Sequence, residues 1–191
     1  MSKRNRLRPV AAAVAVGATA ALLVACQSMV TTKERPPLAL APSVDLPRFM
    51  GDWYVIAAIP TIFEKNAFSP RDSYRLDADG TIATTFSYRA GSFDGDAKSM
   101  SSRGFVLGQG NAVWGQQYVW PIKADYRISW LSPDYTETVI TREKRDYVWI
   151  MARTPTIPAE DLARLKQFVQ SQGYAAEKLQ LVPQDAAAAA R

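Results

Sequence analysis

The feature that most constrains the fold is a series of short segments between residues 51 and 153 in which apolar and polar side chains alternate. A period of two is typical of β-strands, because successive side chains of a strand point to opposite faces. We count eight segments: 51–60, 72–76, 81–88, 98–107, 112–120, 126–130, 136–141 and 147–153. Most of the links between them are as short as hairpins. Sequential hairpins favour an antiparallel up-and-down β-barrel, because a parallel sheet would need crossover helices.

One helix is expected after the strands. Pro158 suits its first turn, Glu160 and Asp161 lie near its positive end, and Gly173 ends it. Its apolar side chains form one stripe, which should pack on the outer wall of the barrel: Leu162, Leu165, Phe168 and Val169. The predicted fold is therefore all-β, an eight-stranded antiparallel barrel with one C-terminal α-helix outside. Residues 174–183 are compatible with a further short strand.

The N-terminal segment has the pattern of a signal peptide. Four basic residues within the first eight positions precede the apolar run 10–25, which is long enough for a signal core and short for a membrane span. From Cys26 onward, 19 basic residues face 18 acidic ones. The net charge of +5 therefore belongs to the targeting segment, and nucleic acid is not an expected partner. We expect residues 1–25 to be removed as the signal.

Cys26 is the only cysteine, and it directly follows the apolar run in the sequence Leu23-Val24-Ala25-Cys26. This motif resembles the bacterial lipoprotein box, in which the cysteine is lipidated and becomes the first mature residue. The alternative is an ordinary signal peptide that ends near a free thiol. Several acyl chains would hold the protein far more firmly than one. Gln27, in place of aspartate, resembles the sorting signal for the outer membrane, so we expect a lipid anchor there, on the periplasmic face.

The remaining segments divide the chain further. Residues 26–43 contain Pro36, Pro37 and Pro42 without a periodic apolar face, and they are expected to be a lipidated N-terminus and flexible tether. The folded domain should span residues 44–184, and residues 185–191 should be a disordered tail. Residues 61–70 read as a long loop, which either folds over the mouth of the barrel or packs on its outside.

Three ordered motifs carry a resemblance to a known family. Gly51-x-Trp53 opens the first segment, and Asp134-Tyr135 falls between the sixth and seventh. The run 147–155, Tyr-Val-Trp-Ile-Met-Ala-Arg-Thr-Pro, ends the series and contains Arg153. Together they resemble the lipocalin family, and more narrowly its bacterial outer-membrane lipoproteins, although Pro133 replaces the threonine of the second motif. The resemblance implies structural roles for Gly51, Trp53 and Arg153, with the guanidinium packed on the indole at the closed end of the barrel.

A lipocalin barrel, or calyx, has room for one small ligand if its inward side chains leave space. Side chains two positions apart on a strand point to the same face. Counting from Trp53, Val55, Ala57 and Ile59 should therefore face inward. Counting back from Arg153, Met151, Trp149 and Tyr147 should do the same. The side chains expected to line a ligand site are mostly aromatic: Val55, Ala57, Tyr74, Phe86, Tyr88, Trp114, Tyr118, Tyr126, Ile128, Tyr147 and Trp149. Such a lining suits an acyl chain with its polar head near the rim. The alternative is a filled core in which the same residues pack together.

Catalytic motifs are absent from the sequence. It contains no histidine, its cysteine is assigned to lipidation, and it has no nucleophile-elbow or phosphate-loop motif. We therefore expect no enzyme activity, cofactor or metal. The leading hypothesis is a monomer or homodimer that binds and stores or transports fatty acids, lysophospholipids or similar amphiphiles. The alternatives are an enzyme acting on a lipid or isoprenoid, and a structural lipoprotein with a solid barrel. Arg75, Arg89 and Arg127 are either partners for an anionic head group or solvated surface residues.

Overall fold

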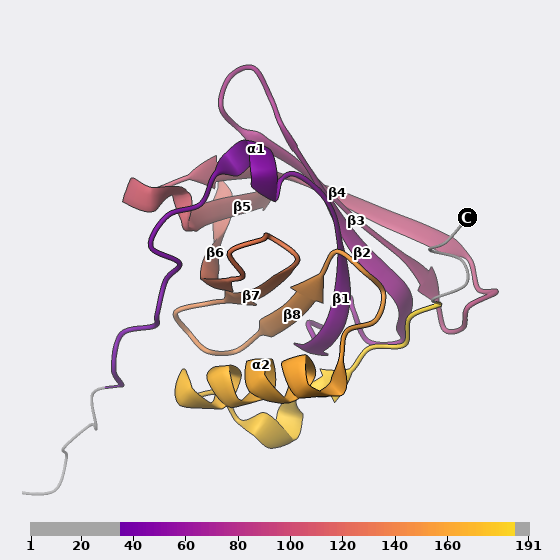
Figure 1. The fold of residues 1–191 in the computed structure, drawn as a ribbon. Coiled ribbons are helices and arrows are strands. Elements are labelled where there is room, and N and C mark those ends of the chain that lie inside the picture. Colours follow the sequence, from indigo (N-terminus) through magenta and orange to yellow (C-terminus); the bar gives the residue numbers. More distant parts are fainter. Residues whose placement is uncertain (1–34, 186–191) are drawn as a thin grey trace, which may run out of the picture. The chain divides into compact units, whose positions relative to one another are not determined.

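The computed structural model describes residues 35–185, so the predicted signal peptide, Cys26 and residues 186–191 of the predicted tail lie outside it. Figure 1 shows strands that curve into a barrel with a helix on its outside. The elements are α1 (Leu46–Phe49), β1 (Gly51–Ile59), β2 (Ala67–Leu76), β3 (Ile82–Ala90), β4 (Ala97–Val106), η1 (Gln109–Asn111), β5 (Val113–Val119), β6 (Ile122–Leu131), β7 (Glu137–Thr141), β8 (Val148–Ala152), α2 (Ala159–Ser171), η2 (Ala176–Lys178) and β9 (Gln180–Leu181). Within the described range, no helix is long and apolar enough to cross a membrane.

The eight long strands close into one barrel. Each pairs antiparallel with the next in sequence, and β1 closes the ring by pairing with both β8 and β2, where Gly51 lies opposite Tyr74. The ninth strand adds two residues to β1, with Leu181 opposite Ala57. The predicted eight-stranded antiparallel barrel is thus confirmed, and the segment after the helix supplies one further short strand.

Antiparallel strands that follow one another place their links at alternating ends. The links β1–β2, β3–β4, β5–β6 and β7–β8 therefore emerge at one end, which we call the open end. The other links emerge at the opposite, closed end. Helix α1 precedes β1 at this closed end, where its buried Phe49 packs on Trp53 with ring centroids 5.0 Å apart. These two aromatic rings form the floor of the barrel, and they belong to the same buried cluster as Tyr74 and Trp114.

Helix α2 lies on the outer wall, beside β7, β8 and β1, as Figure 1 shows. Pro158 is its N-cap, and Leu165 and Val169 are buried on its inner face. The predicted stripe packs against outward side chains of the barrel, including Ile56, Val139 and Ile150. The single C-terminal helix and the face it buries are as the 3.6-residue periodicity predicts.

Two strands begin earlier than the sequence pattern predicts. Strand β2 starts at Ala67, but its pairing with β3 shifts register between Phe68 and Arg71, so the period of two is broken there. Strand β6 starts at Ile122, four residues before the first clean alternation, and its pairing with β5 also shifts register. In β2 the extra residue interrupts the alternation and hides the start of the strand, whereas between β5 and β6 the extra residue lies in β5 and does not explain the earlier start of β6.

A third bulge reverses the orientation of the end of β1. The pairing with β8 shifts between Val55 and Ala57, so that Ile56 is an extra residue. Val55 and Ala58 lie in the inner core, whereas Ala57 and Ile59 pack in the outer cluster beneath α2. The prediction that Ala57 and Ile59 face inward is therefore wrong. One inserted residue moves every later side chain to the opposite face.

The predicted tether ends earlier than expected, because residues 36–43 lie against the barrel. The backbone N–H of Ala41 donates to the carbonyl of Ile128 at 2.9 Å, and both Leu38 and Ala41 are buried. Single apolar residues between prolines have no periodicity, so the sequence pattern gives no sign of this packing. The described part of the segment is thus an ordered strap along the barrel wall.

Candidate ligand-binding site

The closed end of the barrel is held by Arg153 and Trp53. The guanidinium carbon of Arg153 lies 3.9 Å from the centroid of the Trp53 ring, and Trp53 is fully buried. The guanidinium also donates to four backbone carbonyls at 2.8–3.2 Å, those of Arg48, Phe49, Asp52 and Tyr135. One side chain thereby joins α1, the start of β1 and the β6–β7 link. A partly desolvated cation on an indole contributes about 2 kcal/mol in addition to these bonds.

Gly51 makes this arrangement possible. Its φ is +93°, a left-handed conformation that other residues adopt only with strain. A Cβ at this position would lie 3.4 Å from Nη1 of Arg153. The indole N–H of Trp53 donates to the carbonyl of Phe49 at 2.9 Å, which satisfies its only buried polar group. The residues of the first motif therefore build the floor and contribute nothing to the cavity above it.

Above the floor lies a cavity of about 530 Å³ that opens between the loops of the open end. This volume is within the range of sites that bury a small organic ligand. Its walls come from β2, β3, β4, β5, β6 and β8, and Thr61 to Glu64 of the β1–β2 link contribute to its mouth. Of the two alternatives for residues 61–70, the structure supports the loop over the mouth, because the beginning of this link lines the cavity.

Six of the predicted residues line this cavity: Tyr74, Phe86, Tyr118, Tyr126, Tyr147 and Trp149. The other five lie elsewhere. Val55, Trp114 and Ile128 are buried in the inner core around the floor, where Trp114 packs on Phe49 with ring centroids 5.4 Å apart. Tyr88 contacts the Phe86 ring but borders a separate surface hollow, and Ala57 faces α2. The barrel is thus filled at its closed end and hollow toward its open end.

The polar groups inside the cavity are mostly paired with one another. The hydroxyls of Tyr74 and Tyr126 lie 2.7 Å apart, and Nε2 of Gln116 donates to Oγ1 of Thr84 at 3.2 Å. Tyr118 is half exposed, but desolvation of its hydroxyl raises the pKa to about 12, so the hydroxyl stays protonated at neutral pH. Paired or neutral polar groups present little charge to a ligand, which leaves the lining largely apolar.

Asp72 is an ionisable group within this lining that the sequence did not predict, and its carboxyl is hydrogen-bonded to Tyr74. Its side chain lines the cavity two residues before Tyr74 on β2, so parity from Tyr74 places it on the inner face. Burial, with a smaller contribution from the negative charge of Glu64, raises the pKa of Asp72 to about 7. Near neutral pH this carboxyl is therefore neutral in part of the molecules.

Two further groups at the mouth come from loops. Oε1 of Glu64 accepts from the indole N–H of Trp149 at 2.7 Å, which fixes the β1–β2 link over the cavity. Arg142, at the start of the β7–β8 link, lines the cavity and pairs with Asp146 at 3.3 Å. Its Nε is buried and has no hydrogen-bond partner within the described structure. Buried N–H groups nearly always have an acceptor, so an unpaired Nε in a residue that lines the cavity is unusual.

The arginines named from the sequence are engaged elsewhere. Arg75 pairs with Asp77 at 3.0 Å, and Arg127 pairs with Asp125 and Glu143 at 3.0 and 2.7 Å. Arg89 donates to the carbonyl of Gly95. None of the three lines the cavity. Among residues 35–185 there is also no group of three or more side chains that could hold a metal ion.

An antiparallel barrel closed by a Trp–Arg pair at one end and hollow at the other defines a calyx, a class of fold that suggests binding of a small hydrophobic ligand. The chain belongs to the family described as Lipocalin-like domain, whose profile matches residues 44–184. Curated relatives include Temperature-induced lipocalin-1 of Arabidopsis thaliana, 28% identical over 158 residues, which are 79% of this chain and 85% of that one.

Bacterial relatives support the narrower subgroup. Outer membrane lipoprotein Blc of Citrobacter freundii is 28% identical over 182 residues, covering 95% of this chain and 99% of that protein. Among solved structures, insecticyanin from the tobacco hornworm Manduca sexta superposes with a TM-score of 0.61 at 13% identity, over 81% of this chain and 88% of the other. That likeness shows the fold.

The raised pKa of Asp72 predicts a pH dependence of stability. In the unfolded chain this carboxyl has a pKa near 3.8, so between pH 4 and 7 the folded state keeps a proton that the unfolded state releases. The stabilisation is complete below pH 4 and is lost as the pH rises to 7, with a slope of at most about 1.4 kcal/mol per pH unit. Solvent in the cavity reduces this slope. In Asp72→Asn the melting temperature, measured by thermal unfolding, should therefore depend less on pH between pH 5 and 8 than in the wild type.

The matched control is Asp94→Asn, which makes the same change on the exposed β3–β4 link. Its melting temperature should follow that of the wild type at every pH. If Asp72→Asn and the wild type differ by the same amount at pH 5 and pH 8, the assignment of a raised pKa to this carboxyl is wrong.

Proposed function

We propose that this protein reversibly binds single-chain amphiphiles, such as fatty acids or lysophospholipids, in the calyx, and that it stores or transports them without chemical change. The observation that carries the proposal is the cavity of about 530 Å³, walled by aromatic side chains and open at one end. A solid structural barrel would have no such space. Burial of each methylene of an acyl chain contributes about 0.8 kcal/mol, so a chain with several buried methylenes gains enough to bind.

The mouth supports an anionic or zwitterionic head group. The unpartnered Nε of Arg142 suits a carboxylate or phosphate oxygen, since hydrogen bonds between ionised groups are the stronger ones. The nearby carboxylates of Glu64 and Asp125 are occupied by Trp149 and Arg127. In this arrangement the head group lies near the rim and the acyl chain extends toward Tyr74 and Asp72.

The proposal is tested by titrating the purified protein with a fluorescent fatty acid. Trp149 lines the cavity, so its emission should be quenched or transferred to the probe as the site fills. We expect saturation at one ligand per chain and displacement by an unlabelled fatty acid. Binding that does not saturate, or that is not displaced, would contradict a defined site.

We further propose that the protein is a lipoprotein of the outer membrane, anchored through a lipid on Cys26. The support is the lipoprotein-like motif and the similarity to bacterial relatives that are named outer membrane lipoproteins. Cys26→Ser should move most of the protein from the membrane fraction to the soluble fraction, as assessed by fractionation and immunoblotting. A variant that stays with the membranes at the wild-type level would refute the lipid anchor.

An enzyme acting on a lipid or isoprenoid is a second candidate, and Asp72 is the observation that favours it. A carboxyl with a pKa of about 7 inside a cavity is suited to proton transfer. Burial of the carboxyl beside Tyr74 also explains its raised pKa without any enzyme activity. Mass analysis of a bound lipid before and after prolonged incubation separates the two functions, because only an enzyme would alter the ligand and lose that activity in Asp72→Asn.

A further inference from the structure

We propose that the open end of the barrel docks on the surface of a lipid bilayer through an apolar rim. The rim consists of five exposed side chains on two links: Ile62 and Phe63 on the β1–β2 link, and Val119, Trp120 and Ile122 at the β5–β6 turn. The partner is the lipid surface itself. This inference concerns how the barrel is oriented, and it goes beyond the ligand-binding function proposed above.

The first argument is how exposed apolar side chains are distributed. Ten large hydrophobic residues are exposed among those the structure describes, and seven of them lie at the open end. Besides the rim these are Tyr118 and Phe93, the latter on the β3–β4 link. Scattered exposed apolar residues need no explanation, but a cluster on neighbouring loops marks an interaction site.

Trp120 identifies the kind of surface. Its side chain is 82% exposed at the tip of the β5–β6 turn. An indole has an apolar body and one N–H donor, and for this reason tryptophan is enriched at the boundary between lipid and water. Its neighbours Val119 and Ile122 are aliphatic and also largely exposed, at 68% and 70%, as expected for side chains that enter the acyl region beside it.

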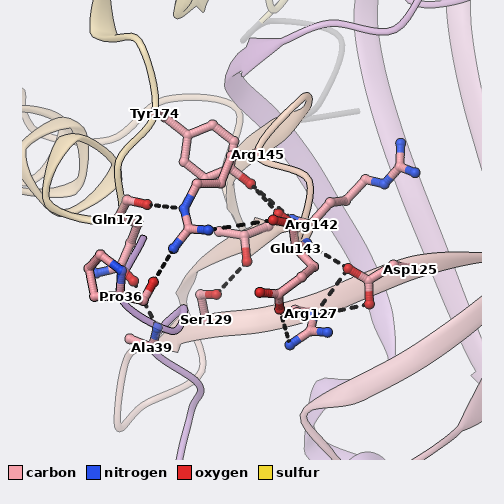
Figure 2. Close-up of polar contacts among 11 residues, drawn as sticks. Pro36, Ala39, Asp125, Arg127, Ser129, Arg142, Glu143, Arg145, Gln172 and Tyr174 are labelled. Atoms are coloured by element: carbon pink, nitrogen blue, oxygen red, sulfur yellow. Dashed lines mark hydrogen bonds and ion pairs between the residues drawn. The ribbon is translucent and has the colours of Figure 1, made fainter. Parts of the chain in front are cut away.

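The second argument is the place where the chain leaves the barrel. Figure 2 shows the carbonyl of Pro36 accepting a hydrogen bond from Nη2 of Arg145, which lies on the β7–β8 link at the open end. The same guanidinium donates through Nε to the carbonyl of Gln172 at 2.6 Å. The side chain of Gln172 accepts from the backbone N–H of Ala39 at 2.8 Å. These bonds fix the start of the ordered strap at the open end.

The strap then runs away from that end. Ala41 bonds to Ile128 in the middle of β6, and the N–H of Val44 donates to the carbonyl of Gly110 at the closed end. Only nine residues lie between Cys26 and Pro36, so the ten steps from one to the other reach at most about 35 Å. A lipid on Cys26 would therefore hold the barrel from the side of its mouth. This second argument rests on the proposed anchor, whereas the first does not.

The charges at the open end do not provide an alternative attraction. The segments 60–66, 91–96, 119–124 and 142–147 together carry five basic and five acidic side chains. Docking should therefore depend on apolar burial and change little with salt. Docked in this way, the mouth would face the acyl region, and a lipid could pass between bilayer and cavity with little exposure to water.

The test uses the chain from residue 26 onward with Cys26→Ser, which keeps the described fold and removes the anchor. Co-flotation with vesicles of phosphatidylethanolamine and phosphatidylglycerol should detect binding that persists in high salt. The double variant Trp120→Ser/Ile122→Ser should bind at least about tenfold more weakly, because two large apolar side chains would no longer be buried in the lipid. Neither residue lines the cavity, so fatty-acid binding should be unchanged.

Leu107→Ser is the matched control, because Leu107 is also exposed, at 57%, but follows β4 at the closed end. It should float with vesicles as the parent protein does. The proposal is overturned if the parent does not bind vesicles, or if the double and control variants bind equally. It is also overturned if the double variant only converts a dimer to a monomer, which would assign the rim to a second copy. A parent protein that docks on vesicles but takes up no fatty acid would instead refute the ligand-binding proposal and leave the docking proposal standing.

Discussion

Trp53→Ala is expected to lower the free energy of unfolding by about 3–5 kcal/mol, a change on the order of 10 °C in melting temperature. Trp53 is fully buried against Phe49, and its ring supports the guanidinium of Arg153. Truncation leaves a cavity in the floor and removes the surface on which that cation is stacked. The four carbonyls bonded to Arg153 would then be held by a side chain that has lost its support. Chemical or thermal unfolding followed by circular dichroism measures the loss.

Trp120→Ala is the matched control, since it removes the same side chain from a position that is 82% exposed. It should change the free energy of unfolding by less than about 0.5 kcal/mol. Equal effects of the two variants would show that the closed end does not depend on Trp53. A fatty-acid affinity that falls in step with stability in Trp53→Ala would indicate loss of the fold rather than a contact with the ligand.

Ala124→Trp is expected to weaken fatty-acid binding at least tenfold while it leaves the melting temperature within a few degrees of the wild type. Ala124 lines the cavity from β6, opposite Gln116 on β5. A large side chain there takes up space that the acyl chain needs. Because the space is already empty, the new ring displaces few packed atoms, in contrast to overpacking of a filled core. The fluorescent fatty-acid titration and a thermal melt measure the two quantities.

The control for this prediction is Ala83→Trp. Ala83 precedes Thr84, which lines the cavity, and the alternation of β3 places Ala83 on the outer face. The same enlargement should leave the dissociation constant unchanged there. If Ala124→Trp binds fatty acid as tightly as Ala83→Trp does, the ligand does not occupy this cavity.

Most of the fold could be predicted because its local and global signals agree. The alternating segments, the hairpin-length links and the helical stripe of Leu165 and Val169 each indicate the same barrel with one outer helix. The motif residues Gly51, Trp53 and Arg153 lie together at the closed end, although a hundred residues separate them. Sequence patterns of this kind report features that many residues share or that a backbone conformation demands.

The cavity could be predicted only in part, since its lining depends on single residues. The bulge at Ile56 moves Ala57 to the outer face, and parity alone does not reveal where a bulge falls. Trp114 and Ile128 point inward but fill the floor, because depth along the barrel depends on strand register. Asp72 was predictable in principle from its parity with Tyr74, but an acidic residue was not expected inside an apolar barrel.

Groups contributed by loops were the least predictable. Arg142 and Glu64 reach the mouth through links whose paths are set by tertiary contacts, such as the bond from Trp149 to Glu64. The same holds for the strap, which Arg145 and Gln172 fix from distant parts of the chain. Neither periodicity nor composition contains information on such pairings. The open end, where the proposed ligand binding and membrane docking take place, is therefore the part of the molecule that the sequence predicts least well.

The central claim is that the calyx holds one intact amphiphile, and native mass spectrometry of the protein isolated from its membranes tests it most directly. We predict a bound species of one lipid per barrel, released unchanged on extraction and identified as a fatty acid or lysophospholipid. Ala124→Trp, isolated in the same way, should lack most of that species. An empty wild-type barrel that also takes up no added fatty acid, or an extracted lipid that the protein has chemically altered, would contradict the account.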